Sequence, residues 1–119
     1  MRPLDGITVV TLEHAVAAPF CTRQLADLGA RVVKVERPGV GDFARAYDER
    51  VKGLASHFVW SNRSKESLTL DVKDARAQGV LGRLLERADV LVQNTCHSRS
   101  FCSPSITIFA SPVGNGPYG

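Results

Sequence analysis

The stretch Ile7–Phe20, ITVVTLEHAVAAPF, decides how the rest of the chain is interpreted. Its first part, Ile7–Leu12, is a continuous β-branched run that predicts a short buried strand. Pro19 suits the first position of a following helix, where a missing N–H costs nothing, and Gly29 suits the left-handed residue that ends it. A second strand is predicted at Arg31–Glu36. In α/β proteins such strand-to-helix turns hold phosphorylated cofactors, yet this turn contains no glycine.

The remaining elements alternate between strand-like and helical patterns. Residues 39–67 lack a clear period and predict an ordered loop with one helical turn, in which His57–Trp60 forms an apolar patch over the core. Further strands are predicted at Ser67–Val72 (an edge strand), Asp89–Asn94 and Ser105–Ser111, and a helix at Asp74–Arg87 with Asp74 as its cap. The predicted buried helix faces are Phe20, Cys21, Leu25 and Leu28 in the first helix and Val80, Leu81, Leu84, Leu85 and Ala88 in the second.

This order of elements predicts an α/β fold with a Rossmann-like, mostly parallel sheet and flanking helices. In such sheets ligands bind beyond the carboxyl ends of the strands. Glu13–Ala18, Arg37 and Asn94–Thr95 are therefore expected along one rim. This expectation follows from the geometry of a parallel sheet alone and does not identify the ligand.

The composition is that of an ordinary globular chain. The 119 residues are 44% hydrophobic and 23% charged, and no apolar run approaches the ~20 residues that span a bilayer. The N-terminal MRPLDGITVV lacks the apolar region and cleavage site of a signal peptide, so we expect a cytoplasmic protein with no membrane partner. Cys21, Cys96 and Cys102 form no CxxC pair, and too few further ligands surround His97 for a zinc site. We therefore expect free thiols and no metal.

Positive charge is concentrated between residues 31 and 65, which hold eight Lys or Arg against four acids. Such a segment is either a solvated basic face or a site for an anion, nucleic acid or a multiply phosphorylated small molecule. No aromatic residues are interleaved with the basic ones as in proteins that bind single strands, so we expect no nucleic-acid partner. The eight basic residues are Arg31, Lys34, Arg37, Arg45, Arg50, Lys52, Arg63 and Lys65.

An NAD site would need G-x-G-x-x-G at the first turn and an acid at the end of the second strand. Glu36 occupies the place of the acid, but Ala15, Ala17 and Ala18 cannot let a backbone approach a pyrophosphate as closely as glycines do. Glu36 is better interpreted as a strand-end residue in an ion pair, which leaves an NAD-binding fragment as an alternative. A serine or cysteine nucleophile is weaker still, because no G-x-S-x-G elbow exists and Cys21 falls inside a helix stripe.

Three blocks of sequence carry a more specific signal. They are PLDGITVVTLEHAVAAPFCTRQLADLGARVVKVERPGVGDFAR (Pro3–Arg45), NRSKESLTLDVK (Asn62–Lys73) and ADVLVQN (Ala88–Asn94). In order and spacing they resemble the N-terminal part of the family III CoA-transferases, the group that includes formyl-CoA and carnitine-type transferases. Within that family the segment is most similar to members acting on small dicarboxylic acids.

The resemblance implies that the glycine-free turn contacts coenzyme A through backbone and small side chains. The ligand would be CoA or an acyl-CoA thioester, a small molecule with several negative charges at one end and a narrow uncharged arm. The implied contacts are His14, Ala15, Val16 and Ala17 along the pocket, Arg37 at the phosphates or adenine, Leu70 and Lys73 at the nucleotide end, and Asn94 and Thr95 beside the pantetheine channel.

The resemblance also implies an enzyme that moves CoA between an acyl-CoA and a carboxylic acid, using a catalytic aspartate downstream of a Gly-Pro-Tyr motif. This chain stops at Gly116–Gly119, GPYG, and none of its aspartates matches the catalytic motif. We therefore expect a chain incomplete relative to the full family fold, which binds CoA at best and lacks turnover. Full-length members dimerise through interlocked chains, and the state of this fragment is left open.

The segment Thr95–Ser105, TCHSRSFCSPS, departs from the family pattern. It is barely long enough for a parallel crossover, and Pro104 rules out a full helix. It predicts an extended or disordered link, with Ser105–Ser111 at the sheet edge or unpaired. The expected organisation is a Rossmann-like CoA-binding portion at residues 1–95 and an atypical, partly disordered tail at residues 96–119. A non-catalytic remnant or interaction fragment and an acyl-CoA racemase-type member of the family are the remaining alternatives.

Overall fold

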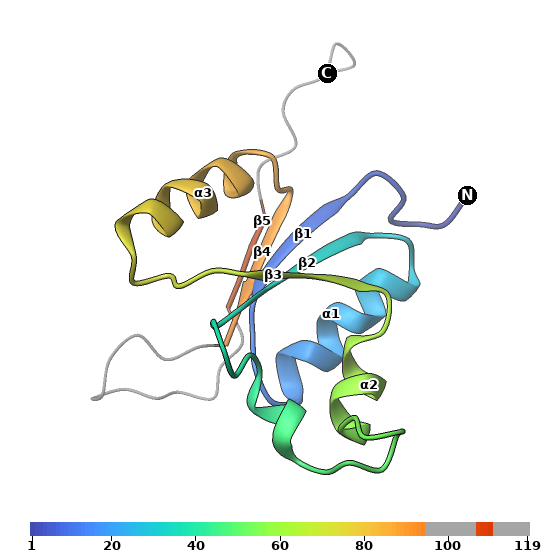
Figure 1. Ribbon diagram of the computed structural model, residues 1–119. Helices are drawn as coiled ribbons and strands as arrows, with labels where there is room; N and C mark the ends of the chain where they lie inside the picture. The colour runs from blue at the N-terminus through green and yellow to red at the C-terminus, as the bar shows by residue number, and fades with distance from the viewer. Residues whose placement is uncertain (95–106, 111–119) are drawn as a thin grey trace.

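The protein, described here by a computed structural model over residues 1–94 and 107–110, is built on one five-stranded sheet (Figure 1). The strand order is β3-β2-β1-β4-β5; β1 to β4 are parallel, and β5 is antiparallel to β4. The elements are β1 (Thr8–Leu12), α1 (Ala17–Asp27), β2 (Arg31–Glu36), the 3-10 helix η1 (Phe43–Ala46), α2 (Ser56–Asn62), β3 (Lys65–Thr69), α3 (Ala75–Glu86), β4 (Val90–Gln93) and β5 (Thr107–Ala110). The predicted α/β fold with a mostly parallel sheet is confirmed.

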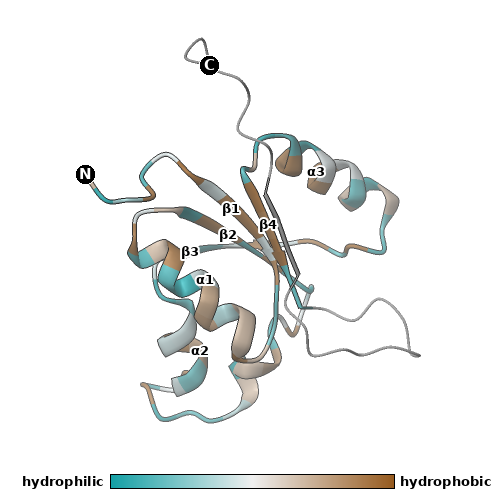
Figure 2. Cartoon of the chain, turned by 180° about the vertical axis from the view of Figure 1, so that it is seen from behind, coloured by the Kyte–Doolittle hydropathy of each residue, from teal (hydrophilic) through white to brown (hydrophobic). Residues whose placement is uncertain are grey.

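The helices cover the two faces of the sheet unequally. Helices α1 and α2 lie on one face and α3 lies on the other, as Figures 1 and 2 show from opposite sides. Alternate strand residues supply the two cores, because successive side chains of a strand point to opposite faces. The core beneath α1 contains Val9, Ala18, Ala26, Ala30, Val32 and Val92. The core beneath α3 contains Val10, Val35 and Ala88, with Leu12, Leu70, Leu81, Leu84, Leu85 and Leu91 partly buried around them.

The first helix has the predicted end but not the predicted buried face. Gly29 adopts φ +110°, and the N–H groups of Gly29 and Ala30 bond the carbonyls of Ala26 and Leu25, which is a Schellman cap. A Cβ on Gly29 would lie 2.5 Å from Asp5 Oδ1, so only glycine fits there.

Helix α1 begins at Ala17 rather than at Pro19, and the predicted stripe was wrong except at Leu25, which is half-buried and packs against the core beneath α1. The face that packs against the sheet is small: Ala18, Pro19, Thr22 and Ala26 are buried. Phe20 is 37% exposed because it faces away from the sheet and stacks on Trp60 of α2, with ring centroids 5.3 Å apart. Of the rest of the predicted stripe, Leu28 is exposed and Cys21 and Leu25 are only half-buried. Small side chains let α1 approach the strands closely. Close packing, rather than the hydrophobicity of each side chain, therefore decided which face of the helix is buried.

Helix α3 confirms its predicted cap. Asp74 accepts a hydrogen bond from the N–H of Arg76 at 2.8 Å, and the helix runs to Glu86. Leu81, Leu84 and Leu85 pack against the core as predicted, but no residue of α3 is fully buried and Val80 is 49% exposed. The prediction that Val80 belongs to the buried face was therefore wrong.

The segment between β2 and β3 contains more helix than predicted, namely η1 and α2. Within α2, Val59 and Trp60 are exposed, so residues 57–60 do not form the expected cover over the core. Strand β3 is an edge strand as predicted, but at Lys65–Thr69 it begins two residues earlier and ends three residues earlier, because it pairs only with β2 and β2 ends at Glu36.

The fourth predicted strand is observed as β4, and β5 lies within the predicted Ser105–Ser111 strand at the sheet edge. The rest of the predicted tail, residues 96–106 and 111–119, lies outside the described residues.

Candidate functional site

The carboxyl ends of β1 to β4 meet at one rim of the sheet. Because all four strands are parallel, the residues that follow them lie along this rim in the order of the strands. His14 and Ala15 follow β1, Arg37 follows β2 and Asn94 follows β4. The chain leaves β1 in one direction to form β2 and β3, and then returns to place β4 on its other side. The gap between β1 and β4 is thus a topological switch point, where ligands bind in open α/β sheets.

The turn between β1 and α1 is held in an unusual conformation. Ala15 has φ +65°, a left-handed value that costs a residue with a Cβ roughly 1–2 kcal/mol. Its N–H donates to Asp42 Oδ1 at 2.9 Å. The same oxygen accepts the N–H of Ala44 at 2.9 Å, which caps η1. One carboxylate oxygen therefore joins the β1–α1 turn to the segment after β2.

Asn94 holds the turn from the other side of the switch point. Its Oδ1 accepts the N–H of His14 at 3.0 Å, and its Nδ2 donates to the carbonyl of His14 at 3.2 Å. This pair of hydrogen bonds reproduces the pairing of a neighbouring strand and continues the contact between β1 and β4. The amide of Asn94 is thus used to position His14.

An aromatic residue that the sequence reasoning missed links two of the predicted site residues. The ring of Phe43 lies edge to face with the ring of His14, with centroids 5.2 Å apart. The guanidinium carbon of Arg37 lies 4.2 Å from the centre of the Phe43 ring, within the range of a cation–π contact. Arg37 also donates to the carbonyl of Gly41 at 3.4 Å. Phe43 is 51% exposed. It lies between Arg37 and Arg45 in the sequence, so the statement that no aromatic residue is interleaved with the basic ones was wrong at this position, and Phe43 was the available signal.

A buried group of charged residues supports this turn between the sheet and helices α1 and α2. Lys34 Nζ lies 2.5 Å from Asp42 Oδ2 and 3.5 Å from Glu13 Oε1, and Lys65 Nζ lies 2.6 Å from Glu13 Oε1. The side chains of all four residues are at most 2% exposed. Two positive and two negative charges balance. Neutral partners complete the network: Thr11, Thr22, Asn62 and the carbonyl of Pro19.

Burial changes the proton affinity of two members of this network. Desolvation lowers the pKa of Lys65 to about 8, against the opposing attraction of Glu13. Desolvation raises the pKa of Asp42, but the hydrogen bond from Lys34 and those from the N–H groups of Ala44 and Ala15 lower it more. The pKa of Asp42 therefore lies below its ordinary value. At neutral pH Asp42 is ionised.

This network corrects the sequence interpretation of the basic segment. Lys34 and Lys65 are buried in ion pairs, so they cannot meet an anion at the surface. Arg31, Arg45 and Arg63 pair with Glu66, Glu36 and Asp27, and the expected ion pair of Glu36 is confirmed at 2.9 Å from Arg45. Within residues 1–94 and 107–110, Arg37, Arg50 and Lys52 are the members of the eight without a carboxylate within 4.0 Å. Of these three, Arg37 stands on the rim.

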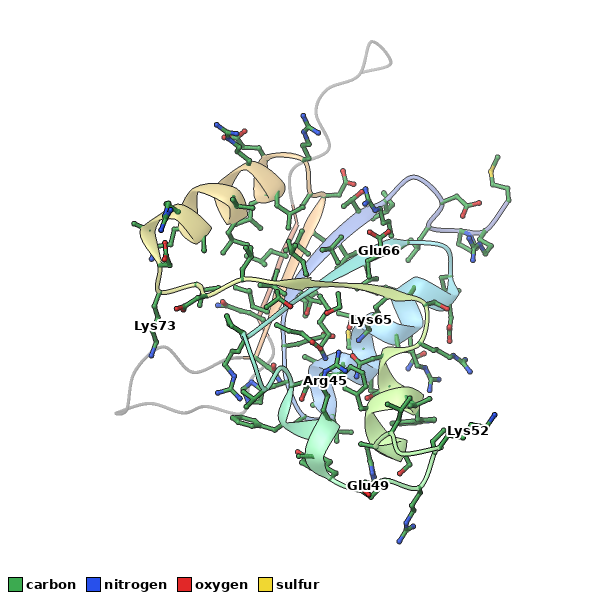
Figure 3. All side chains as sticks on the ribbon, in the orientation of Figure 1. Arg45, Glu49, Lys52, Lys65, Glu66 and Lys73 are labelled. Carbon is green, nitrogen blue, oxygen red and sulfur yellow. The ribbon has the colours of Figure 1, made fainter. Side chains whose placement is uncertain are left out.

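The remaining predicted site residues lie in different surroundings, some exposed and one packed in the core. Val16 and Ala17 are exposed at the start of α1, beside the turn. Leu70 is half-buried and packs into the core beneath α3, so its side chain is not free at the rim. Lys73 is exposed on the β3–α3 connection and lies apart from Arg45 and Lys65 in Figure 3. Thr95 lies outside the described residues.

Comparisons with known proteins give one consistent result. The family model for CoA-transferase family III matches residues 4–99. An acetyl-CoA:oxalate CoA-transferase from Acetobacter aceti is 41% identical over 92 residues, which are 77% of this chain and 24% of that protein. A succinyl-CoA:glutarate CoA-transferase from Mus musculus is 40% identical over 95 residues, which are 79% of this chain and 22% of that protein.

Solved structures agree with the sequence relatives. A CAIB/BAIF family protein from Brucella suis matches 79% of this chain and 26% of that one, with a TM-score of 0.73 and 36% identity. A hypothetical protein from Mycobacterium tuberculosis matches 76% and 25% of the two chains, with a TM-score of 0.69 and 41% identity. The chain thus spans about a quarter of the length of these relatives.

Membrane-spanning helices and metal sites can be assessed only in the part of the chain that the structure describes. No helix there is both long and apolar enough to cross a bilayer. No group of three or more His, Cys, Asp or Glu side chains in that part is arranged to hold a metal ion.

Proposed function

The chain belongs to CoA-transferase family III, and on this premise we propose that its rim forms part of the CoA site of an enzyme that moves CoA between an acyl-CoA and a carboxylic acid. The relatives named above act, by their names, on oxalate and on glutarate. We propose a small dicarboxylate as the acceptor for the same reason.

The observation that carries this proposal is the state of Arg37. Of the eight basic residues between 31 and 65, it is the one that stands on the rim without a carboxylate partner among the described residues, and Phe43 and the carbonyl of Gly41 hold its guanidinium in place. A guanidinium held by an aromatic ring retains its full charge and its outward N–H donors. It is therefore suited to bind the phosphates of CoA. An arginine already paired with a carboxylate would attract those phosphates less strongly.

The turn itself suits the uncharged arm of CoA. Ala15, Val16 and Ala17 place small apolar side chains at the start of α1, where the first turn carries no acidic residue. The unpaired N–H groups at a helix start favour an acceptor or an anion. His14 flanks this surface, and Asn94 fixes His14 through its backbone.

The roles of the outer residues differ in the proposal. Lys73 would reach only a nucleotide that extends along the rim toward the β3–α3 connection, so its contribution is smaller than that of Arg37. Leu70 supports the rim from within the core, since its side chain packs beneath α3. Thr95 keeps its proposed place beside the pantetheine arm.

Calorimetric titration tests the proposal. The chain is titrated with CoA, with dephospho-CoA and with pantetheine. CoA should release heat, and Arg37→Ala should weaken binding about tenfold, because a charge-assisted hydrogen bond contributes roughly 1.5–3 kcal/mol. Lys73→Ala should weaken binding by about threefold. Arg83→Ala is the control, since Arg83 is an exposed cation on α3 and should leave the affinity unchanged.

Two outcomes would contradict the CoA site. One is the absence of heat with CoA from a chain that is folded by circular dichroism. The other is equal affinity of wild type and the Arg37→Ala variant. Pantetheine should bind more weakly than CoA in every variant, because it lacks the phosphates that Arg37 would contact.

We further propose that this chain by itself binds CoA without turnover, since none of its aspartates matches the catalytic motif implied by the family. Acetyl-CoA and oxalate are incubated with the chain, and oxalyl-CoA is measured by chromatography. No product is expected. Formation of product would locate a catalytic carboxylate within these residues.

A further inference from the structure

We infer that Asp42 is the positioning residue of the rim: its carboxylate fixes the β1–α1 turn and the start of η1 together, and so places His14 and Arg37 on either side of Phe43. This inference rests on the proposed CoA site. It adds a residue that lies beneath the site, outside the set expected to contact CoA. Asp42 acts on the ligand only through the backbone and side chains that it holds.

The first step of the argument is the number of contacts made by one buried carboxylate. Asp42 Oδ1 accepts the N–H groups of Ala15 and Ala44, both at 2.9 Å, and Oδ2 accepts from Lys34 Nζ at 2.5 Å. The Asp42 side chain has no exposed surface. The three partners come from three places in the sequence: the β1–α1 turn, η1 and β2.

The second step is that neither the turn nor η1 is stable locally in this arrangement. Ala15 occupies a left-handed conformation that disfavours a residue with a Cβ. The 3-10 helix η1 has only four residues, too few to persist without outside support. The hydrogen bonds from Asp42 offset both costs at once.

The third step connects Asp42 to the surface that would meet CoA. Phe43 follows Asp42 directly and is the first residue of η1. Its ring contacts His14, which precedes Ala15, and lies beneath the guanidinium of Arg37. Among residues 1–94 and 107–110, the Asp42 carboxylate is the group whose hydrogen bonds join the turn to η1, and without them the ring contact between His14 and Phe43 would have to hold the two segments together. The ring of Phe43 would then no longer hold its place between His14 and Arg37.

The fourth step is the electrostatic reason for an aspartate at this position. Lys34 is buried, and a buried cation requires a close anion. The cation in turn keeps Asp42 ionised, which makes Oδ1 a strong acceptor for two N–H groups. An asparagine cannot serve both sides, because its amide oxygen can face the two N–H groups or Lys34, but not both.

The experiment compares Asp42→Ala and Asp42→Asn with a matched control, Asp48→Ala. Asp48 also bridges a loop to a helix start: it accepts the N–H groups of Arg50 and Ser56 and the hydroxyl of Ser56. Its partners belong to the segment that leads into α2. Asp48→Ala thus removes the same kind of bond from another place in the same chain.

Affinity for CoA is measured by calorimetry at a temperature at which every variant is folded by circular dichroism. Asp42→Ala should weaken binding by about tenfold or more, as expected when a binding group loses its support. Asp42→Asn should weaken it less, since it can keep one set of bonds. Asp48→Ala should leave it unchanged. Equal affinities for Asp42→Ala and Asp48→Ala would overturn the inference.

A second readout needs no ligand. In a ¹H–¹⁵N spectrum the amide protons of Ala15 and Ala44 should lie downfield in the wild type because they bond a carboxylate. In the Asp42→Ala variant both should move upfield. In the Asp48→Ala variant they should not move.

The two readouts distinguish the possible failures. If the amide signals respond as expected and no protein binds CoA, the proposed function fails and the positioning by Asp42 holds. If the amide signals of Ala15 and Ala44 do not respond to Asp42→Ala, the positioning inference is wrong whatever the affinity for CoA. If Asp42→Ala does not fold at any temperature, Asp42→Asn takes its place. A neutral amide oxygen is a weaker acceptor than a carboxylate, so both amide signals should still move upfield, and signals that stay in place would overturn the inference.

Discussion

The two faces of the sheet are stabilised in different ways. Beneath α1 and α2, Lys34 and Lys65 are buried with Glu13 and Asp42 in a charge-balanced network. Beneath α3 the contacts are apolar, and no residue of that helix is fully buried. One face therefore combines an apolar core with a few exact polar contacts, and the other consists of buried Val10, Val35 and Ala88 with half-buried leucines around them.

The difference follows the position of the candidate site. Burying charges costs several kcal/mol for each ion before their attraction is counted, so a buried network is a costly way to pack a helix on a sheet. Here the network leads from the core to the turn that we propose to bind CoA, through Glu13 and Asp42. The apolar face makes no such connection in the described residues. Its contribution to stability should accordingly be more tolerant of substitution.

The largest expected effect is on the charged face. Glu13→Gln keeps the size of the side chain but removes the anion that faces both Lys34 and Lys65. We expect the free energy of unfolding, measured with urea, to fall by about 3–5 kcal/mol, as for other buried pairs that lose one partner. Glu66→Gln is the control, because Glu66 pairs with Arg31 at the surface and its loss should have a far smaller effect. If the free energy of unfolding fell equally in the two variants, the buried ion pairs would contribute no more to stability than the exposed pair.

The next effect is a dependence of stability on pH. The pKa of Lys65 is about 8 in the folded protein and 10.5 for an unperturbed lysine. Between these values the unfolded chain binds more protons than the folded one, so the free energy of unfolding rises with pH. Lys65 should contribute an increase of about 2 kcal/mol from about pH 7.5 to about pH 9.5.

The control for this dependence is Lys65→Met. Urea unfolding of the variant should show a smaller increase over the same pH range, with the difference assigned to Lys65. If the free energy of unfolding of the wild type stays level or falls over this pH range, as it does in the variant, then burial does not lower the pKa of Lys65.

A smaller effect is expected on the apolar face. Leu84→Ala removes part of a half-buried side chain that packs α3 against the sheet. We expect a loss of about 1–2 kcal/mol, below the usual range for a fully buried leucine. Val80→Ala, on the same helix but 49% exposed, should change the free energy of unfolding by less than about 0.5 kcal/mol. A loss as large as that of Glu13→Gln would mean that α3 is not the more tolerant element.

The smallest effect is a gain. Gly82 lies inside α3, and a Cβ added there would meet no atom within 4 Å. Gly82→Ala should therefore raise the free energy of unfolding by about 0.5–1 kcal/mol through helix propensity alone. Thermal unfolding followed by circular dichroism is sensitive enough to detect the shift. A loss of stability would show that helix propensity does not decide the effect of a substitution at this position.

Much of the fold was predictable because it depends on local rules. Val9, Val32 and Val92 belong to β-branched runs that have few alternatives to a buried strand. Gly29 and Asp74 mark the ends of helices through their backbone and side-chain chemistry, which needs no tertiary partner. The parallel arrangement follows from the alternation of strands and helices. The carboxyl ends of the predicted strands placed Glu13–Ala18, Arg37 and Asn94 at one rim, and the structure brings His14, Ala15, Arg37 and Asn94 to one edge.

The buried face of α1 and the fate of the basic residues were not predictable in the same way. Lys34 resembles any other basic residue in the sequence, and its burial depends on Asp42 and Asn62 arriving beside it from other parts of the chain. Phe20 was expected inside on hydrophobicity, but Trp60 offers it a partner on the outer side. Both outcomes depend on which segments meet, and one-dimensional patterns do not contain that information.

The sequence by itself determined the α/β order of elements, the end of α1, the start of α3 and the family, because each rests on residues close together in the chain or on blocks kept in order. The tertiary structure alone decided which charges are buried and which remain available, because that depends on distances between residues far apart in sequence. In the part of the chain that the structure describes, Arg37 has no carboxylate within 4.0 Å at the rim, whereas Lys34 and Lys65 are paired with acids inside. That separation explains how a broadly basic segment presents one cation beside the turn.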